Sequence, residues 1–255
     1  MVKSGWNGEQ MKATAIEFRL RVAILALIVV LGYWSPWIEL WDLGTRRSLL
    51  EGLALDLART GVVSFAVATP LVIVLAALTA WKGAVLRVWG TAYLGNRTVS
   101  HARMQAGHVL AEGPYRFVRN PLYLGSWCMF AAMAFLMPAS GALLAVVLIT
   151  IFLLRLIFGE EAFLKARLGE SYAEYLNSVP RLFPHLRGLR ETWEKPARSK
   201  PQWGRAVAAE INPIGVFLVM AILSWSYDNG LMVRAIIVSF GISIVVKALM
   251  PETQE

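Results

Sequence analysis

The chain has 255 residues, 57% of them hydrophobic, and its mean hydropathy is +0.54, which excludes an ordinary soluble domain. Its apolar runs are continuous and approach the roughly 20 residues that a helix needs to cross a bilayer. The net charge of +8 lies in loops beside these runs, so the positive-inside rule explains it without a nucleic-acid partner. The composition therefore predicts an all-α, polytopic helical membrane protein.

Six apolar stretches are expected to form membrane-spanning helices. The first follows a polar segment that contains Lys12 and Arg19 and lacks a small-residue cleavage site, so it is interpreted as a retained anchor. A tight pair is expected in the middle of the chain, turned at Pro138 and Gly141, and another pair at its end. The predicted spans are residues 20–38, 61–81, 122–137, 141–158, 211–227 and 232–249.

Three segments between the spans have their own patterns. Residues 48–59 place leucines at helical spacing and predict an amphipathic surface helix. Residues 82–94 are apolar but too short and basic to span a membrane, and they can continue the second helix. Residues 195–202 are rich in proline and lysine, as in a linker. Strand signals and internal repeats are absent from the sequence.

Loop charges predict the orientation of these spans. The loop at residues 39–60 balances its charges and is placed outside, whereas residues 82–119 carry six Lys or Arg against Glu112 alone. Residues 155–205 are again rich in Lys and Arg. Both basic segments, and with an even number of spans both termini, are therefore expected in the cytosol.

Polar residues between the second and third spans indicate an anion site. Asn120 precedes a proline and favours an extended backbone, and Pro121 suits the first turn of a helix. Free N–H groups of that turn, beside Arg119, can bind a carboxylate or phosphate. Tyr115 and Tyr123 add aromatic faces suited to a purine or a cation. A positive-inside loop with interface tyrosines remains an equally good interpretation of this pattern.

Acids and one arginine near the end of the fourth span form a second candidate group. Glu160 and Glu161 run against the basic trend of this face, and a carboxylate beside an apolar core can hold a hydroxyl pair or a cation. Arg155 is the one charge within its apolar run, which predicts a functional role, with snorkelling to the interface as the alternative. The three histidines lack metal-site spacing, so no metal is predicted.

Two stretches resemble one family. "HVLAEGPYRFVRNPLYLGSW" and "GEEAFLKARLGESYAEYLNSVPRLFP" are similar in order and spacing to the isoprenylcysteine carboxyl methyltransferase and phospholipid methyltransferase superfamily. The resemblance covers about residues 86–184. It implies a membrane enzyme with a cytosol-facing site that uses S-adenosylmethionine to methylate a lipid or lipidated acceptor, either a prenylcysteine-type carboxylate or a phospholipid amine.

The resemblance also implies site residues. Cofactor contacts carry over to His108, Val109, Leu110, Ala111, Tyr115, Asn120, Pro121, Tyr123 and either Glu160 or Glu161, with Arg116 or Arg119 a candidate for the cofactor carboxylate. Arg155 and Glu161 are expected to serve the acceptor, Glu161 as a proton acceptor if the acceptor is an amine. Two departures affect these roles: Asn120 stands where carboxyl methyltransferases often have His, and Arg155 lies one residue before the usual arginine position.

The expected organisation has three parts. Residues 1–81 hold two spans, residues 82–194 the methyltransferase core, and residues 195–255 a linker with a last hairpin. Two other functions stay open: a membrane reductase of the sterol-reductase type that uses NADPH, and a non-catalytic membrane protein that retains the motif. The identity of the acceptor and the oligomeric state are not determined by the sequence.

Overall fold

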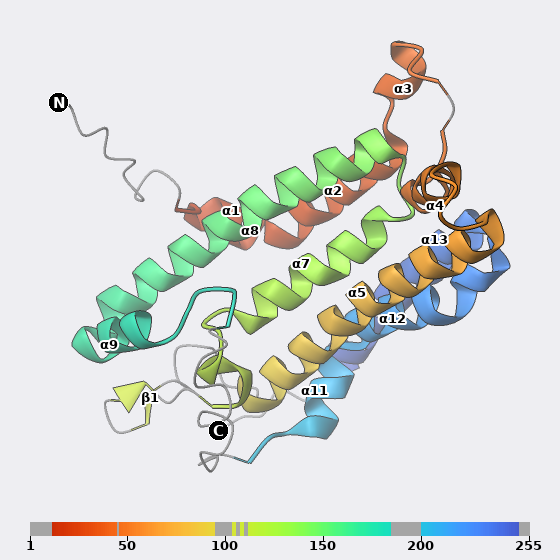
Figure 1. The fold of residues 1–255 in the computed structure, drawn as a ribbon. Helices are drawn as coiled ribbons and strands as arrows, with labels where there is room; N and C mark the ends of the chain where they lie inside the picture. Colours follow the sequence, from red (N-terminus) through yellow and green to blue (C-terminus); the bar gives the residue numbers. More distant parts are fainter. Residues whose placement is uncertain are drawn as a thin grey trace.

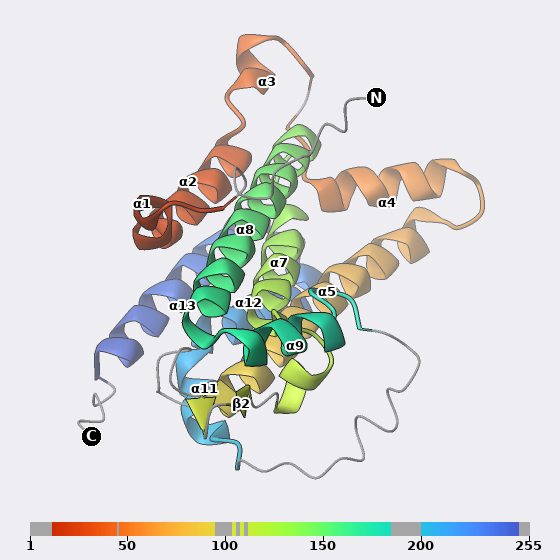
Figure 2. The same cartoon turned by 90° about the vertical axis from the view of Figure 1, so that its left-hand side faces the viewer.

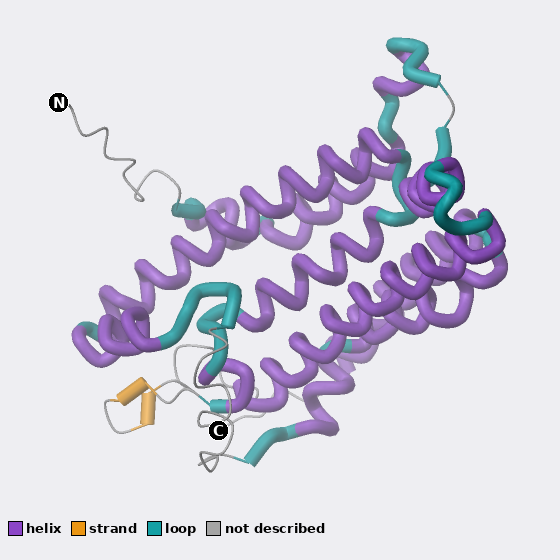
Figure 3. The backbone as a smooth tube through the Cα atoms, viewed as in Figure 1, coloured by secondary structure: helices purple, strands orange, loops and turns teal. Residues whose placement is uncertain are grey.

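The computed structural model describes residues 12–44, 46–94, 104–105, 108–109, 112–184 and 200–249. Within them, each of the six predicted apolar stretches forms a helix, as Figure 3 shows. Helix α2 lies beside α8, and α7 lies between that pair and the group of α5, α12 and α13 (Figure 1). The helices are α2 (Arg21–Trp34), α5 (Phe65–Leu94), α7 (Pro121–Ala134), α8 (Ala139–Leu168), α12 (Ile211–Ile222) and α13 (Asn229–Leu249).

Among the described residues, four helical stretches are long and apolar enough to cross a membrane, or five if a bent pair is counted as one span. The four are Arg21–Leu40, α5, α8 and α13, and the bent pair joins Trp203–Ala209 to Ile211–Ser226 at 71°. Helix α7 is apolar but has only 14 residues, roughly 21 Å, against a hydrocarbon core of about 30 Å. The fold class is therefore confirmed, and the predicted count of six spans is not.

Surface helices border the first span. Helix α1 (Ala15–Arg19) starts with a capping box between Thr14 and Glu17, and α3 (Trp37–Leu40) follows α2. The amphipathic helix predicted at residues 48–59 is confirmed as α4 (Leu49–Arg59), capped by Ser48. Its apolar face packs on α5, with Leu50 and Ala54 buried in one cluster with α5 residues. This arrangement matches the amphipathic pattern of the segment.

Two helices are longer than an isolated span requires. Helix α5 continues without a break through Lys82 to Leu94, as predicted, and so crosses the division expected at residue 81. Helix α8 begins at Ala139, so the expectation that Gly141 marks the preceding turn is wrong. Gly141 instead lies where α8 touches α2, because a Cβ there would clash with the carbonyl oxygen of Gly32.

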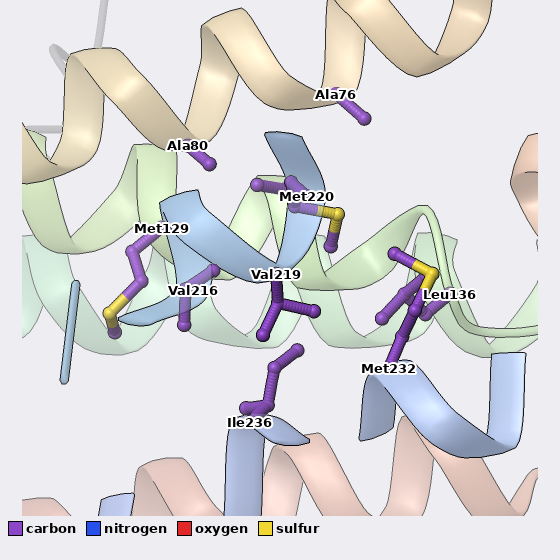
Figure 4. Close-up of a cluster of buried hydrophobic side chains, with 10 residues drawn as sticks. Ala76, Ala80, Met129, Leu136, Val216, Val219, Met220, Met232 and Ile236 are labelled. Atoms are coloured by element: carbon purple, nitrogen blue, oxygen red, sulfur yellow. The ribbon is translucent and has the colours of Figure 1, made fainter. Parts of the chain in front are cut away.

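The C-terminal helices pack on the middle of the chain. Helix α11 (Trp203–Ala209) precedes α12, and the short η2 (Leu223–Ser226) leads to α13. Val216, Val219 and Met220 of α12 lie between Ala80 of α5 and Ile236 of α13 in one buried cluster (Figure 4). The three-part division of the chain stays a prediction, but its parts share this core.

Short elements gather at one end of the bundle (Figures 1 and 2). They are η1 (Gly113–Arg116), α9 (Glu170–Ser178) and an unexpected antiparallel pair of two-residue strands, β1 (Met104–Gln105) and β2 (His108–Val109). Helices α5 and α8 end there and α7 begins there, whereas α3 and α4 lie at the opposite end. Hence residues far apart in sequence meet at this end.

Candidate functional site

A buried carboxylate, Glu161 of α8, is the centre of a polar cluster. Its Oε1 accepts a hydrogen bond from Asn120 Nδ2 at 3.0 Å, and its Oε2 accepts from Arg181 Nη2 at 2.9 Å and Nε at 3.1 Å. Arg119 Nε lies 3.5 Å from Oε1. The chain thus surrounds one acid with two guanidinium groups and an amide, a charge-assisted network that orients all four side chains.

Arg119 also ties two loops together. Its backbone N–H donates to the carbonyl of Pro180 at 2.9 Å, and its Nη1 donates to the carbonyl of Leu176 at 2.9 Å. Its buried Nε makes no hydrogen bond within the described part of the chain. Nε thus meets Glu161 only as an ion pair at 3.5 Å and has no hydrogen-bond acceptor, so it can still donate a hydrogen bond to a polar ligand.

Local sequence explains why these side chains meet. Asn120 has φ −125° and ψ 56°, outside the helical region, and Pro121 follows as the first residue of α7, as predicted. Gly113 has φ +54°, and a Cβ there would clash with the ring of Tyr93. A side chain at residue 113 would therefore disfavour both the left-handed backbone and its contact with α5.

Tyrosines pack beneath the cluster. Tyr115 is buried, and its carbonyl accepts a hydrogen bond from the hydroxyl of Tyr175 at 2.9 Å. The Tyr172 and Tyr175 rings are 5.8 Å apart and buried with Leu164 of α8. Tyr123 packs instead against the core between α7 and α8. The tyrosines thus join η1, α9 and α8, and the expected open aromatic face of Tyr115 is mostly covered.

Arg155 lies apart from this cluster in its contacts. Its Nη2 and Nε donate to the carboxylate of Glu17 at 2.9 and 3.1 Å, and Nη2 also donates to the carbonyl of Lys12 at 3.3 Å. The backbone N–H of Ala13 donates to the carbonyl of Arg155 at 3.0 Å. Among described residues, Arg155 therefore fastens α1 to α8 and is not a partner of Glu161.

The structure describes the remaining predicted site residues to different extents. Glu160 is half-buried beside Glu161 and has no hydrogen bond or ion pair with a described residue. The backbone of His108 and Val109 forms β2, but their side chains, and all of Leu110 and Ala111, lie outside the described residues. Within the described residues, no three His, Cys, Asp or Glu side chains come together as a metal site would require.

The comparison with known families decides which family this arrangement resembles. Residues 63–171 match the sequence model of the phospholipid methyltransferase family. This matched segment is somewhat less than half of the chain and includes Asn120 and Glu161, whereas Arg181 lies beyond it. Searches of curated proteins and of solved structures gave no match.

An apolar pocket of about 620 Å³ is lined mostly by residues of the matched segment, near the polar cluster. Its walls come from one face of α5, from η1 and the residues after it, from α7, and from the loop that follows α9. The lining includes Lys82, Leu86, Trp89, Phe117, Leu124 and Cys128. Val118 and Leu182 also line it, next in sequence to Arg119 and Arg181, so pocket and cluster share two backbone segments.

Sequence reasoning missed two parts of this region. Arg181 stands in the quoted motif after Val179-Pro180, yet its role as the main partner of Glu161 follows only from the fold. The second part is a buried ion pair, in which Arg87 Nε donates to Glu210 Oε2 at 2.6 Å and Arg87 Nη2 to Oε1 at 3.0 Å. An isolated acid directly before an apolar helix was the available signal for Glu210.

The Arg87–Glu210 pair joins the matched segment to the C-terminal helices. Thr91 donates to Glu210 Oε1 at 2.7 Å, and Arg87 Nη1 donates to Ser126 Oγ of α7 at 2.6 Å. Glu210 stands at the 71° bend between α11 and α12. The bend is therefore tied to α5 and, through Arg87, to the first turns of α7.

Proposed function

We propose that the protein is an integral membrane methyltransferase that uses S-adenosylmethionine and acts on a lipid or lipidated acceptor. The observation that carries this proposal is the convergence of Asn120, Glu161 and Arg119 at one end of the bundle, beside an apolar pocket. The match to the phospholipid methyltransferase family supports the reaction class. Apolar helices around the site support an acceptor that is delivered by the bilayer.

The chemistry of the available groups fits the polar parts of the cofactor. Glu160 is a half-buried carboxylate without a described partner, suited to an ammonium group or a ribose hydroxyl pair. The buried Nε of Arg119 is a donor suited to a carboxylate. The N–H groups of the first turn of α7 add partial positive charge. The predicted contacts of His108, Val109, Leu110, Ala111, Tyr115, Pro121 and Tyr123 belong to the same proposal.

When bound, S-adenosylmethionine supplies an activated methyl group, which an oxygen or nitrogen of the acceptor takes, with S-adenosylhomocysteine as the second product. The chain then has to orient both partners and exclude water from the reacting atoms. Glu161 holds Asn120 and Arg181 in place, and so positions the start of α7 against the loop after α9. A further role of Glu161 as proton acceptor requires that one of these bonds be released.

The structure supports the predicted acceptor-side role of Glu161 better than that of Arg155. Glu161 lies at the centre of the cluster, and we keep it in the proposed site. Arg155 is engaged by Glu17 and the backbone before α1, so its proposed catalytic role would act through the position of α1. We place the cluster, the pocket and both termini on the cytoplasmic side, on the basis of the loop charges.

Calorimetric titration of the purified protein with S-adenosylhomocysteine, and separately with NADPH, tests the function. The wild type should bind S-adenosylhomocysteine and not NADPH. Glu160→Gln should weaken that binding roughly 10- to 150-fold, the loss of one hydrogen bond to a charged group. Glu174→Gln, a change of an exposed acid on α9, is the matched control and should bind normally. Binding of NADPH alone would favour a reductase, and binding of neither a non-catalytic protein.

A further inference from the structure

One charged side chain lines the pocket beside the polar cluster. Lys82 of α5 lines it, whereas the other lining residues are uncharged and mostly apolar. Lys82 is exposed and makes no hydrogen bond or ion pair with a described residue. By contrast, Arg87, one turn further along the same helix, is fully engaged by Glu210 and Ser126. The pocket thus combines an apolar body with one cation that has no partner among the described residues.

The position of Lys82 along α5 sets the level of the pocket in the membrane. Residues 65–81 of α5 carry no charge and rise roughly 25 Å as a helix, most of the thickness of a hydrocarbon core. Lys82 is the first charge after this stretch, and Trp81 and Trp89 near it are residues typical of the interface. The pocket therefore lies at the depth of lipid headgroups.

The pocket and the Arg87–Glu210 ion pair lie on different faces of α5. Lys82, Leu86 and Trp89 follow one face of α5, whereas Gly83 and Arg87 face α7 and the C-terminal helices. Gly83 lets the two helices approach closely, because a Cβ there would lie 2.9 Å from the carbonyl oxygen of Gly125. The pocket wall therefore includes residues of both α5 and α7, near the point where the two helices cross closely.

We infer that this pocket is the acceptor site, and that it takes an amphiphile whose apolar chain lies against Leu86, Leu124 and Phe117 and whose anionic group, a carboxylate or a phosphate, pairs with Lys82. The volume of about 620 Å³ is within the range of sites for small organic molecules. Charge complementarity selects an acceptor with an anionic group over a purely cationic amphiphile. This inference rests on the proposed methyltransferase function and adds to it the pocket that holds the acceptor and the residue that pairs with its anionic group.

Photo-crosslinking in the absence of cofactor tests whether the pocket binds an anionic amphiphile. The probes are two alkyl chains of equal length that each carry a diazirine, one ending in a carboxylate and the other in an amine. Their crosslinks to the purified protein are mapped by mass spectrometry. The carboxylate probe should label the pocket walls. Lys82→Ala should reduce this labelling roughly fivefold, the effect of one lysine near an anionic group, and Lys82→Glu should reverse the preference between the probes.

Matched variants separate the pocket from the lipid-facing surface. Leu124→Trp fills the pocket and should abolish labelling of its walls, whereas Val85→Trp, at an exposed position on α5 outside the lining, should not. Lys247→Glu removes an exposed cation at the end of α13 and should leave the preference unchanged. Equal labelling by the two probes in wild type and Lys82→Glu, or unchanged labelling in Leu124→Trp, would overturn the inference.

Transfer of labelled methyl groups tests whether the molecule bound in the pocket is the methyl acceptor. Membranes that contain the wild type should transfer label from S-adenosylmethionine into extracted lipids. Leu124→Trp should lose this transfer while S-adenosylhomocysteine still binds. Full transfer by Leu124→Trp would mean that the pocket holds a bilayer lipid and not the acceptor, and would leave the proposed reaction intact. A wild type that neither binds S-adenosylhomocysteine nor transfers label would instead overturn the proposed function itself.

Discussion

At the scale of single residues, Asn120 shows how one amide can connect two loops. Its Nδ2 donates to Glu161 Oε1 at 3.0 Å and to the carbonyl of Arg181 at 3.4 Å, and the side chain is buried. The resemblance to carboxyl methyltransferases, by contrast, implies a histidine at this position. The amide contacts Glu161 and the carbonyl of Arg181 without a charge of its own, so its substitution separates geometry from electrostatics.

Asn120→Ala should lower the free energy of unfolding by about 1–3 kcal/mol, because the buried Glu161 loses a hydrogen-bond donor. Asn120→Asp should cost more, because it places a second carboxylate against Glu161. Thermal unfolding in detergent measures both. Asn177→Ala and Asn177→Asp, at an exposed position on α9, provide controls that should differ little from wild type. Equal stability of Asn120→Ala and Asn120→Asp would contradict the electrostatic part of this prediction.

The pair of Glu17 and Arg155 should make stability depend on pH in acid. Hydrogen bonds from Arg155, then from the backbone of Thr14, lower the pKa of Glu17 from 4.5 to about 2. A lowered pKa means that the pair contributes fully above about pH 4.5 and that its contribution is lost as the pH falls through 2. The side chain of Glu17 is 26% exposed, so water screens the pair and we expect about 1 kcal/mol.

Unfolding of wild type and Glu17→Gln between pH 5 and pH 2 measures this contribution. The difference in stability between the two proteins should be full at pH 5 and vanish near pH 2. Glu174→Gln, which changes an exposed acid without a described partner, should show no such convergence. A difference that stayed constant with pH would indicate that Glu17 acts through packing and not through its charge.

At the scale of secondary-structure elements, the close crossing of α5 and α7 depends on glycine. A Cβ at Gly83 would lie 2.9 Å from both the carbonyl oxygen of Gly125 and the backbone nitrogen of Met129. These are backbone atoms, so no rotamer change can relieve the contact. The two helices would have to move apart, and the pocket and the start of α7 would move with them.

Gly83→Ala should therefore lower the free energy of unfolding by about 1–3 kcal/mol, despite the better helix propensity of alanine. Gly52→Ala is the control: Gly52 is in α4, and a Cβ there would meet no atom within 4 Å. That variant should be neutral or more stable by up to about 1 kcal/mol. Chemical denaturation of both variants checks the prediction, which an unaffected Gly83→Ala would contradict.

At the scale of the whole molecule, the site elements and the pair of α3 and α4 lie at opposite ends of the helix bundle (Figure 1). Loop charge predicts that the site end is cytosolic. Single cysteines at Ser178 of α9 and at Thr60 after α4 test it, in a Cys128→Ala background. A membrane-impermeant maleimide should label Thr60→Cys in intact cells and Ser178→Cys only after lysis. Labelling of Ser178→Cys in intact cells would reverse the topology.

Much of the secondary structure follows from the sequence. Uncharged stretches such as residues 65–81 predict apolar helices, and the leucine spacing and Ser48 predict α4 and its start. Asn120-Pro121 predicts the beginning of α7, because proline restricts the residue before it and suits the first turn. The order and spacing of the motifs also indicated the methyltransferase family that residues 63–171 match. All of these are local properties of the chain.

Pairings between distant residues were decided only by the tertiary structure. Arg155 was expected beside the acceptor but pairs with Glu17, 138 positions away in sequence. Arg181 and Glu210 were not singled out, yet each engages a residue of the matched segment. Helix α7 looked like a span, but at 14 residues it is short and packs between neighbours. Periodicity and helix-start rules describe each segment by itself. An ion pair or a shared core depends on how the helices pack, and no local pattern in the sequence shows which distant residues will meet.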